Sequence, residues 1–335
     1  MKFREVAGVR LSTVGLGTWQ FGSREWGYGP VYALGIAPEV VASSLERGVN
    51  LFDTAEIYGF GQSERILGEA LGERRAEAFI ATKLFPVAPF DPVVTRRAHL
   101  SAGRLAIDVI DLYQVHWPNP VVPLSATMGP LGRLQREGLV GHVGVSNFGL
   151  DRWRRAEELL GGPVLSNQVR YNLIDRRIER DVLSWAQEHD RLVLAYSPLQ
   201  QGVLTARYGP DNAPRGFRSN TAAFLPENLR RVEPLLQVLR RVADAHDASP
   251  AQVSLAWCLR RPNVIVIPGA SSVAQAESNA EAADLELTDD EDAELTSASD
   301  EYQPVRGAAV VGTIARRRAE EVAGRVRRIV EGLRA

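Results

Sequence analysis

Four side chains with acid–base chemistry lie where short apolar runs of the sequence end. Asp53 ends one run, and Tyr58 follows it five residues later in a Gly-rich loop. Lys83 and His116 end the next two runs. A carboxylate, a phenol, an ammonium and an imidazole are the groups that proton transfer uses. Each could also be structural alone: Asp53 as a loop cap, Tyr58 as a rim aromatic and His116 as a core histidine.

Lys83 stands out in a chain that otherwise uses arginine. Of the 39 basic residues only Lys2 and Lys83 are lysine. Arginine keeps its proton and presents a planar fork, whereas an ammonium is compact and its pKa can be moved. The retained lysine therefore indicates a site that needs an ammonium, although chance survival stays open.

The elements that position these residues alternate along the chain. Apolar runs predict strands at 13–19, 50–55, 78–83, 110–116, 140–147, 163–169, 192–199 and 264–270. Helical spacing predicts helices at 38–48, 63–72, 92–106, 124–137, 150–160, 179–189, 228–246, 250–261 and 273–284. Start and stop signals support several of them, namely Ser63, Ser249-Pro250, Gly48, Gly72 and Gly138.

Eight strands that alternate with helices favour a (β/α)8 TIM barrel of class α/β. A doubly wound open sheet is the alternative, but its Gly-rich turn should continue as a helix, and 15–22 does not. An N-terminal hairpin around Ala7-Gly8 is expected to plug the barrel bottom. We expect one barrel domain over 1–300 and a helical extension over 301–335. In a barrel, the four polar residues converge on the C-terminal mouth.

Seven sequence blocks, in order and spacing, carry a resemblance to a known family. They are 53-DTAEIYGFGQSERILGEAL-71, 81-ATK-83, 115-VHWP-118, 144-GVSNF-148, 167-NQVRYN-172, 196-YSPL-199 and 268-PGASSVAQAESNAEA-282. Over residues 2–285 the chain closely resembles the aldo-keto reductases. The resemblance implies a (β/α)8 barrel that reduces carbonyls with a nicotinamide cofactor. It also implies that Asp53, Tyr58, Lys83 and His116 form the catalytic tetrad, with Tyr58 as the acid.

The expected chemistry needs a proton donor aimed at the carbonyl oxygen. A free tyrosine, with a pKa of about 10, is a reluctant donor. An ammonium roughly 4 Å away contributes about 4 kcal/mol, or about three pKa units, before a neighbouring carboxylate cancels part of it. We therefore expect Lys83 to lower the pKa of Tyr58 and Asp53 to hold Lys83. His116 would bond the substrate oxygen as a neutral imidazole or relay a proton.

The resemblance also implies a set of cofactor residues. Ser146, Asn147 and Gln168 would hold the carboxamide, and Tyr196 would stack on the nicotinamide. Ser197, Leu199 and Gln201 would lie along the pyrophosphate. The adenosine end is assigned to Gly269, Ser271, Ser272, Gln275 and Asn279. Thr18, Trp19 and Asp53 are also expected to bind the cofactor.

The adenosine end departs from the pattern of many relatives, which place Lys or Arg where this chain has Ser271-Ser272. NADPH is the expected cofactor, and NADH remains open. Arg207, Arg215 or Arg218 could supply the missing charge.

The expected substrate is a small or medium aldehyde, ketone or keto-sugar. Aromatic residues near the strand ends predict an aromatic wall; they are Trp19, Phe21, Trp26, Tyr28, Phe85 and Trp117. The irregular stretch 200–229 is expected to be a lid. Two other functions stay open: a dinucleotide-binding regulatory module with little turnover, and a lyase that forms a Schiff base on Lys83.

Composition argues against several partners. A net charge of −2 and a pI near 6.3 leave no basic field for nucleic acid or an anionic membrane. The N-terminus lacks a signal core, apolar runs are too short to span a bilayer, and Cys258 is the single cysteine. We expect a cytoplasmic protein without a metal site.

The last segment has its own pattern. An apolar stripe recurs at spacings of three and four through Ala315, Ala319, Val322, Val326, Ile329 and Leu333. This helix is expected to dock on its own barrel, to pack on a second subunit as a homo-oligomer contact, or to form a free or substrate-covering tail.

Overall fold

The chain folds as a (β/α)8 barrel, as the alternation of strands and helices predicted. The computed structural model describes residues 1–22, 32–214, 221–305 and 310. The barrel strands are β3 (Leu16–Gly17), β4 (Leu51–Asp53), β5 (Phe79–Leu84), β6 (Ile110–Val115), β7 (Val140–Ser146), β8 (Ser166–Arg170), β9 (Leu192–Tyr196) and β10 (Val264–Val266). All are parallel and pair in chain order from β3 to β10.

Two bridges close this sheet into a barrel. Val14 pairs with Val266 and Gly17 with Gly269, both in parallel register. The amide of Gly15 donates to the Val266 carbonyl at 2.8 Å, and the amide of Gly17 donates to the Pro268 carbonyl at 3.0 Å. The first and last strands of the barrel, β3 and β10, are therefore neighbours.

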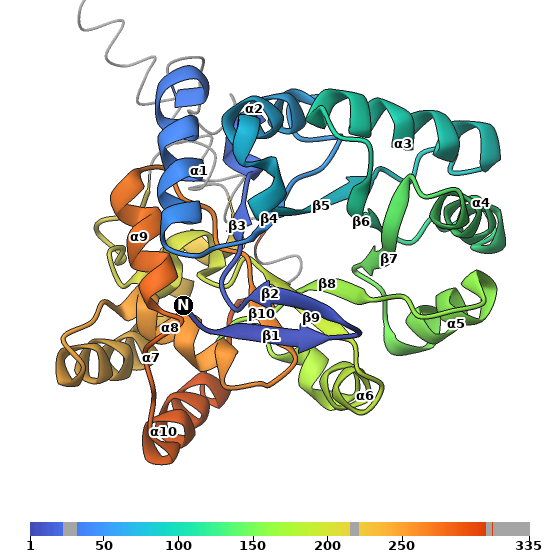
Figure 1. Cartoon of the computed structure of the whole chain (residues 1–335). Coiled ribbons are helices and arrows are strands. Elements are labelled where there is room, and N and C mark those ends of the chain that lie inside the picture. The colour runs from blue at the N-terminus through green and yellow to red at the C-terminus, as the bar shows by residue number, and fades with distance from the viewer. Residues whose placement is uncertain (23–31, 215–220, 306–309, 311–335) are drawn as a thin grey trace, which may run out of the picture.

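An N-terminal hairpin covers one end of the barrel, as expected (Figure 1). Its strands are β1 (Phe3–Val6) and β2 (Val9–Ser12), which pair antiparallel. The turn places Ala7 and Gly8 at φ 50° and 78°, where glycine is favoured. Val6 and Leu11 pack with apolar residues of the barrel interior, so the hairpin fills the end opposite the mouth.

Helices surround the strands (Figure 1). They are α1 (Ala37–Glu46), α2 (Gln62–Leu71), α3 (Asp91–Leu105), α4 (Ser125–Arg136), α5 (Leu150–Leu160), α6 (Val182–Glu188), α7 (Pro226–Ala245), α8 (Pro250–Leu259), α9 (Val273–Glu281) and α10 (Asp289–Asp300). Shorter turns are η1 (Trp19–Gly22), η3 (Tyr32–Ile36), η4 (Gly72–Glu77), η5 (Arg177–Arg180), η6 (Gln200–Thr205) and η8 (Ala222–Phe224).

Two details differ from the helices expected from the sequence. The helix α10 was not expected, although Thr288 and Glu291 form a capping box at its start. Ser63 was expected to cap α2, but that helix begins at Gln62 after Gly61, and Ser63 lies inside it. The Ser63 hydroxyl is buried and serves the site described below.

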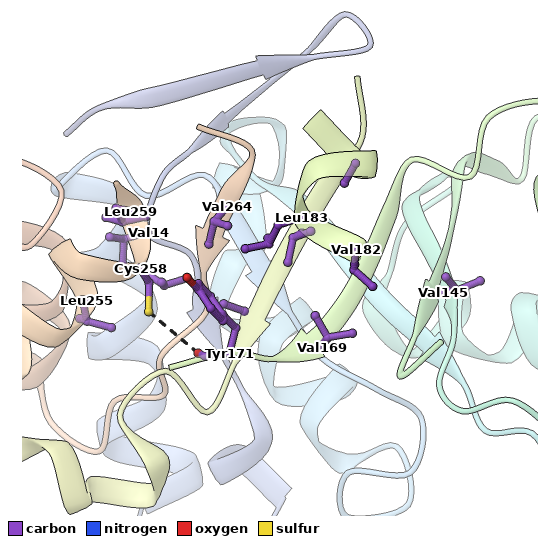
Figure 2. Packing of buried hydrophobic residues seen from close by; sticks show 14 of the residues in the cluster. Val14, Val145, Val169, Tyr171, Val182, Leu183, Leu255, Cys258, Leu259 and Val264 are labelled. Carbon is purple, nitrogen blue, oxygen red and sulfur yellow. Dashed lines mark hydrogen bonds between the residues drawn. The ribbon is translucent and has the colours of Figure 1, made fainter. Parts of the chain in front are cut away.

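The main core lies between the strands and the helices. Alternate strand residues point away from the barrel axis and pack against helical side chains, as Val169 and Val264 do against α6 and α8 (Figure 2). Cys258 on α8 is fully buried there, with its Sγ 3.9 Å from the Tyr171 carbonyl oxygen. The other strand residues point into the barrel, and near the mouth they are polar.

The boundary at residue 300 and the extension 301–335 stay predictions. The stripe from Ala315 to Leu333 lies outside the described residues, as do Trp26, Tyr28, Arg215 and Arg218. No helix in the described part of the chain is both long and apolar enough to cross a membrane.

Candidate active site

A buried ion pair between Lys83 and Asp53 forms the floor of the site. Lys83 Nζ lies 2.6 Å from Asp53 Oδ1 and donates to the Thr54 carbonyl at 2.8 Å. Both charged side chains are almost inaccessible to solvent. Burial alone would lower the pKa of Lys83, but Asp53 and Tyr58 outweigh that effect and raise it. Lys83 therefore remains a protonated ammonium.

Tyr58 stands beside this ammonium. Lys83 Nζ donates to the Tyr58 hydroxyl at 3.3 Å and lies 5.0 Å from the centroid of its ring. Burial raises the pKa of Tyr58, and the charge of Lys83 opposes that rise only in part. The expected net lowering of this pKa is wrong, because desolvation of the phenolate outweighs the cation. Tyr58 is therefore a protonated phenol at neutral pH.

Two glutamines face the second oxygen of Asp53. Gln168 on β8 reaches across the barrel, and its Nε2 donates to Asp53 Oδ2 at 2.6 Å. Gln114 on β6 approaches the same oxygen at 3.5 Å, and its own Oε1 has no partner among the described residues. Lys83 therefore contacts one carboxylate oxygen of Asp53, and the two glutamines face the other.

His116 forms the wall of the site next to Tyr58. Their ring centroids are 5.8 Å apart, edge to face. Trp117 stacks flat on His116 at 3.7 Å between centroids. Burial, assisted by the charge of Lys83, lowers the pKa of His116 to about 2. The imidazole is therefore neutral, which agrees with the first of its two expected roles.

Close backbone packing holds the loop that carries Tyr58. Gly59 has φ 56°, and a Cβ there would lie 2.6 Å from the Gly22 carbonyl oxygen. The amide of Ser63 donates to the Tyr58 carbonyl at 3.2 Å, while its hydroxyl donates to the Thr18 carbonyl at 2.8 Å. The Gly-rich sequence is thus required where the loop passes against η1.

Several residues expected to bind the cofactor lie close to the Lys83–Asp53 pair. The amide and the hydroxyl of Thr18 donate to the Asp53 carbonyl at 2.8 and 2.9 Å. The Ser146 hydroxyl donates to the Gln168 carbonyl at 2.8 Å. Asn147, at φ 61°, accepts from the Tyr196 hydroxyl at 2.9 Å. Trp19 begins η1, directly after Thr18.

The expected pyrophosphate loop follows β9 with unusual backbone angles. Ser197 and Gln201 have φ of 51° and 58°. The Asn172 amide donates to the Ser197 carbonyl at 2.9 Å, which ties this loop to the end of β8. Leu199 packs partly against the core, and the buried Oε1 of Gln201 has no partner in the described residues.

The expected adenosine end is built around the start of α9. Gln275 Oε1 accepts from the amide and the hydroxyl of Ser271 at 2.9 and 2.8 Å. Ser272 caps the helix by accepting from the Gln275 amide at 3.3 Å. The Asn279 amide donates to the Gly269 carbonyl at 3.4 Å. Residues 269–279 contain no Lys or Arg.

Among the described residues of the expected aromatic wall, Phe85 and Trp117 lie beside His116, whereas Phe21 does not. Phe85 stands edge-on to Trp117 at 5.8 Å and to His116 at 6.4 Å. Phe21 is 1% exposed and belongs to the core beneath α1 and α2, so its expected place in the wall is wrong. The loops after β4, β5 and β6 also carry exposed apolar side chains, which are Phe60, Val87, Phe90, Trp117 and Val121.

Sequence reasoning missed several residues that shape the site. Gln114 could have been found because it lies two positions before His116 and therefore on the same strand face. Arg170 could have been found in the same way, because it lies two positions after Gln168 and therefore on the same strand face. Glu56, which accepts from the Phe85 amide at 2.6 Å, and Asn172 gave no signal beyond lying within the quoted blocks.

The chain is similar to a known family over most of its length. The sequence model of the Aldo/keto reductase family matches residues 13–300. An uncharacterised oxidoreductase of Mycobacterium tuberculosis is 52% identical over 306 residues, which cover 91% of this chain and 95% of that protein. The NADH-specific methylglyoxal reductase of Escherichia coli is 30% identical over 308 residues, covering 84% and 92%.

A solved structure is similar over a comparable length. It is an aldo/keto reductase from Klebsiella pneumoniae in complex with NADP and acetate, 28% identical, with a TM-score of 0.72. The match covers 91% of this chain and 97% of that one.

Proposed function

The chain belongs to the aldo/keto reductase family of oxidoreductases, and we propose that it reduces a carbonyl compound with Tyr58 as the proton donor. The observation that carries the proposal is the contact of the Tyr58 hydroxyl with the buried Lys83–Asp53 pair. Tyr58 is protonated, as an acid must be, and Lys83 stabilises the phenolate that remains after transfer. Neutral His116 donates a hydrogen bond to the same substrate oxygen.

A nicotinamide dinucleotide fits the residues of this site. A bound nicotinamide would supply the hydride. The buried oxygen of Gln201, without a partner in the described part of the chain, and the hydroxyls and amides of Ser146, Asn147 and Ser271 offer the donors and acceptors of such a ligand. Tyr196, fixed through its hydroxyl by Asn147, offers a flat platform for the ring.

NADPH is the expected cofactor, with only a small preference over NADH. The segment that would face the 2′-phosphate has serine hydroxyls and Gln275 but no cation. One relative is named NADH-specific and one similar structure contains NADP, so both forms occur among similar proteins. We propose NADPH, with a preference over NADH of about tenfold or less, within roughly 1.4 kcal/mol.

The substrate we propose is a small or medium aldehyde, ketone or keto-sugar. Phe85 and Trp117 form one side of the mouth, and apolar side chains such as Phe60 and Val121 stand on its rim. These surfaces favour carbonyl compounds with an apolar portion.

The lyase alternative is disfavoured by the surroundings of Lys83. A Schiff base needs an unprotonated amine, whereas Asp53 and Tyr58 hold the pKa of Lys83 above its usual value. Its Nζ already donates to Asp53, the Thr54 carbonyl and Tyr58. The regulatory alternative would differ by tight dinucleotide binding with negligible turnover.

A panel of carbonyl compounds tests the proposal, with loss of reduced-nicotinamide absorbance as the signal. NADPH and NADH are supplied in parallel, and Tyr58→Phe is the matched variant. The proposal is supported if the unaltered chain reduces a carbonyl compound and Tyr58→Phe does not. Tight binding of both dinucleotides without turnover on any carbonyl would favour the regulatory module instead.

A further inference from the structure

Arg170 places a positive charge inside the mouth of the barrel. It follows Gln168 by two positions on β8, so both side chains leave the same strand face. Gln168 faces the barrel interior, because its amide reaches Asp53. The buried Nε of Arg170 has no hydrogen-bond partner among the described residues. This cation therefore stands one step nearer to solvent than the Asp53–Gln168 contact.

The guanidinium of Arg170 lies over the ring of Tyr196. Arg170 Cζ is 5.6 Å from the centroid of the Tyr196 ring, and the two residues are register partners. The Tyr196 hydroxyl donates to Asn147, which follows β7, while Tyr196 itself ends β9. Because β8 lies between these two strands, the ring crosses the end of β8, where Arg170 stands.

The charge of Arg170 differs from its neighbours in having no compensating carboxylate among the described residues. Lys83 is paired with Asp53 at 2.6 Å. Arg177, whose charge also reaches Tyr196, is paired with Asp175 at 2.8 Å. An uncompensated charge produces the larger net field at the ring.

We infer that Arg170 makes the site prefer a reduced over an oxidised nicotinamide dinucleotide. The inference rests on the proposed role of Tyr196 as the platform for the ring. The reduced ring is neutral and the oxidised ring carries a positive charge, so a cation over the platform disfavours the oxidised form and not the reduced one. The result is a site biased toward binding the cofactor in the form that carbonyl reduction consumes.

Equilibrium binding tests the inference without turnover. The unaltered chain, Arg170→Gln and Arg170→Lys are titrated with NADP+ and NADPH, and with NAD+ and NADH, by quenching of tryptophan fluorescence. The measured quantity is the ratio of the oxidised to the reduced Kd. We expect Arg170→Gln to lower this ratio by roughly threefold to tenfold, and Arg170→Lys to keep most of it.

Arg155→Gln is the matched control, because Arg155 is an exposed arginine on α5 that pairs with Glu158. An unchanged ratio in a well-folded Arg170→Gln protein would overturn the inference, as would an equal change in Arg155→Gln. Equal weakening of both redox forms would also overturn it, since Arg170 would then hold the dinucleotide regardless of charge. Binding of no dinucleotide by the unaltered chain would overturn the proposed function and this inference together.

Discussion

Lys83 and Asp53 form a 2.6 Å ion pair in which neither side chain meets solvent appreciably. The ammonium is compact and donates to three oxygens, those of Asp53, Thr54 and Tyr58. A pair buried in this way depends on both partners, because removing one leaves an uncompensated charge.

Lys83→Arg should therefore lose most of its turnover. The guanidinium keeps the charge, but it is larger than the ammonium and cannot reproduce three contacts in a fully enclosed space. We expect kcat to fall at least about 100-fold. Steady-state kinetics with the best carbonyl substrate measure it, and Lys2→Arg, at an exposed pair with Glu286, is the control. Turnover near that of the unaltered chain would show that any cation suffices at this position.

Tyr58→Phe should abolish reduction while leaving dinucleotide binding within a few fold. The hydroxyl contacts Lys83. In the proposed function it also faces the substrate, so its loss should remove the proton donor and little else. A decrease in kcat of about 100-fold to 10,000-fold is expected. Kinetics and fluorescence titration measure the two effects separately. If the variant turns over like its parent, Tyr58 is not the acid.

His116 should make stability depend on pH. Its folded pKa of about 2 lies below the unfolded value of about 6.5, so the unfolded chain binds more protons between these values. Stability should therefore fall as pH falls below about 6.5, by up to about 1.4 kcal/mol per unit. From pH 7 to pH 5 the loss is about 2 kcal/mol.

Urea unfolding at pH 7 and pH 5 checks this dependence. His116→Gln should lose about 2 kcal/mol less than the unaltered chain over this interval. His99→Gln, at an exposed histidine, is the control and should behave like its parent. If the free energy of unfolding falls equally from pH 7 to pH 5 in the unaltered chain and in His116→Gln, then His116 takes up its proton in the folded state.

Gln275→Arg should raise the preference for NADP over NAD. It places a cation in the segment expected to face the 2′-phosphate, at the cost of the two bonds from Ser271. We expect the Kd for NAD divided by the Kd for NADP to increase about tenfold. The control is Gln187→Arg, which adds the same charge at an exposed position of α6. A ratio unchanged from the parent would place the phosphate elsewhere.

Deleting residues 312–335 should lower the melting temperature or change the elution volume. The sequence predicts an apolar stripe there, which needs a surface to cover it. The proposed tetrad and cofactor residues all precede residue 280, so Tyr58-dependent reduction should remain measurable. Thermal melting and size-exclusion chromatography check the deletion. Complete loss of turnover in a well-folded truncate would make the segment part of the active site.

Much of the barrel could be read from the sequence because its signals are local. Strands covered on both faces appear as short apolar runs, and the intervening helices show their own spacing. The place of Asp53, Lys83 and His116 at strand ends follows from the same alternation, since parallel strands of a barrel end at one mouth. The resemblance added cofactor residues, whose contacts with a dinucleotide stay predictions.

Only the tertiary structure decided how these groups affect one another. The sequence suggested that Lys83 would lower the pKa of Tyr58, but the depth of burial reverses the net direction. Phe21, read as a wall residue, is core because η1 turns it beneath α1 and α2. The contacts of Gln114 and Gln168 with Asp53, and of Arg170 with Tyr196, join different strands. Periodicity reports which face a residue takes, whereas desolvation and charge depend on distances across the barrel that only the folded chain sets.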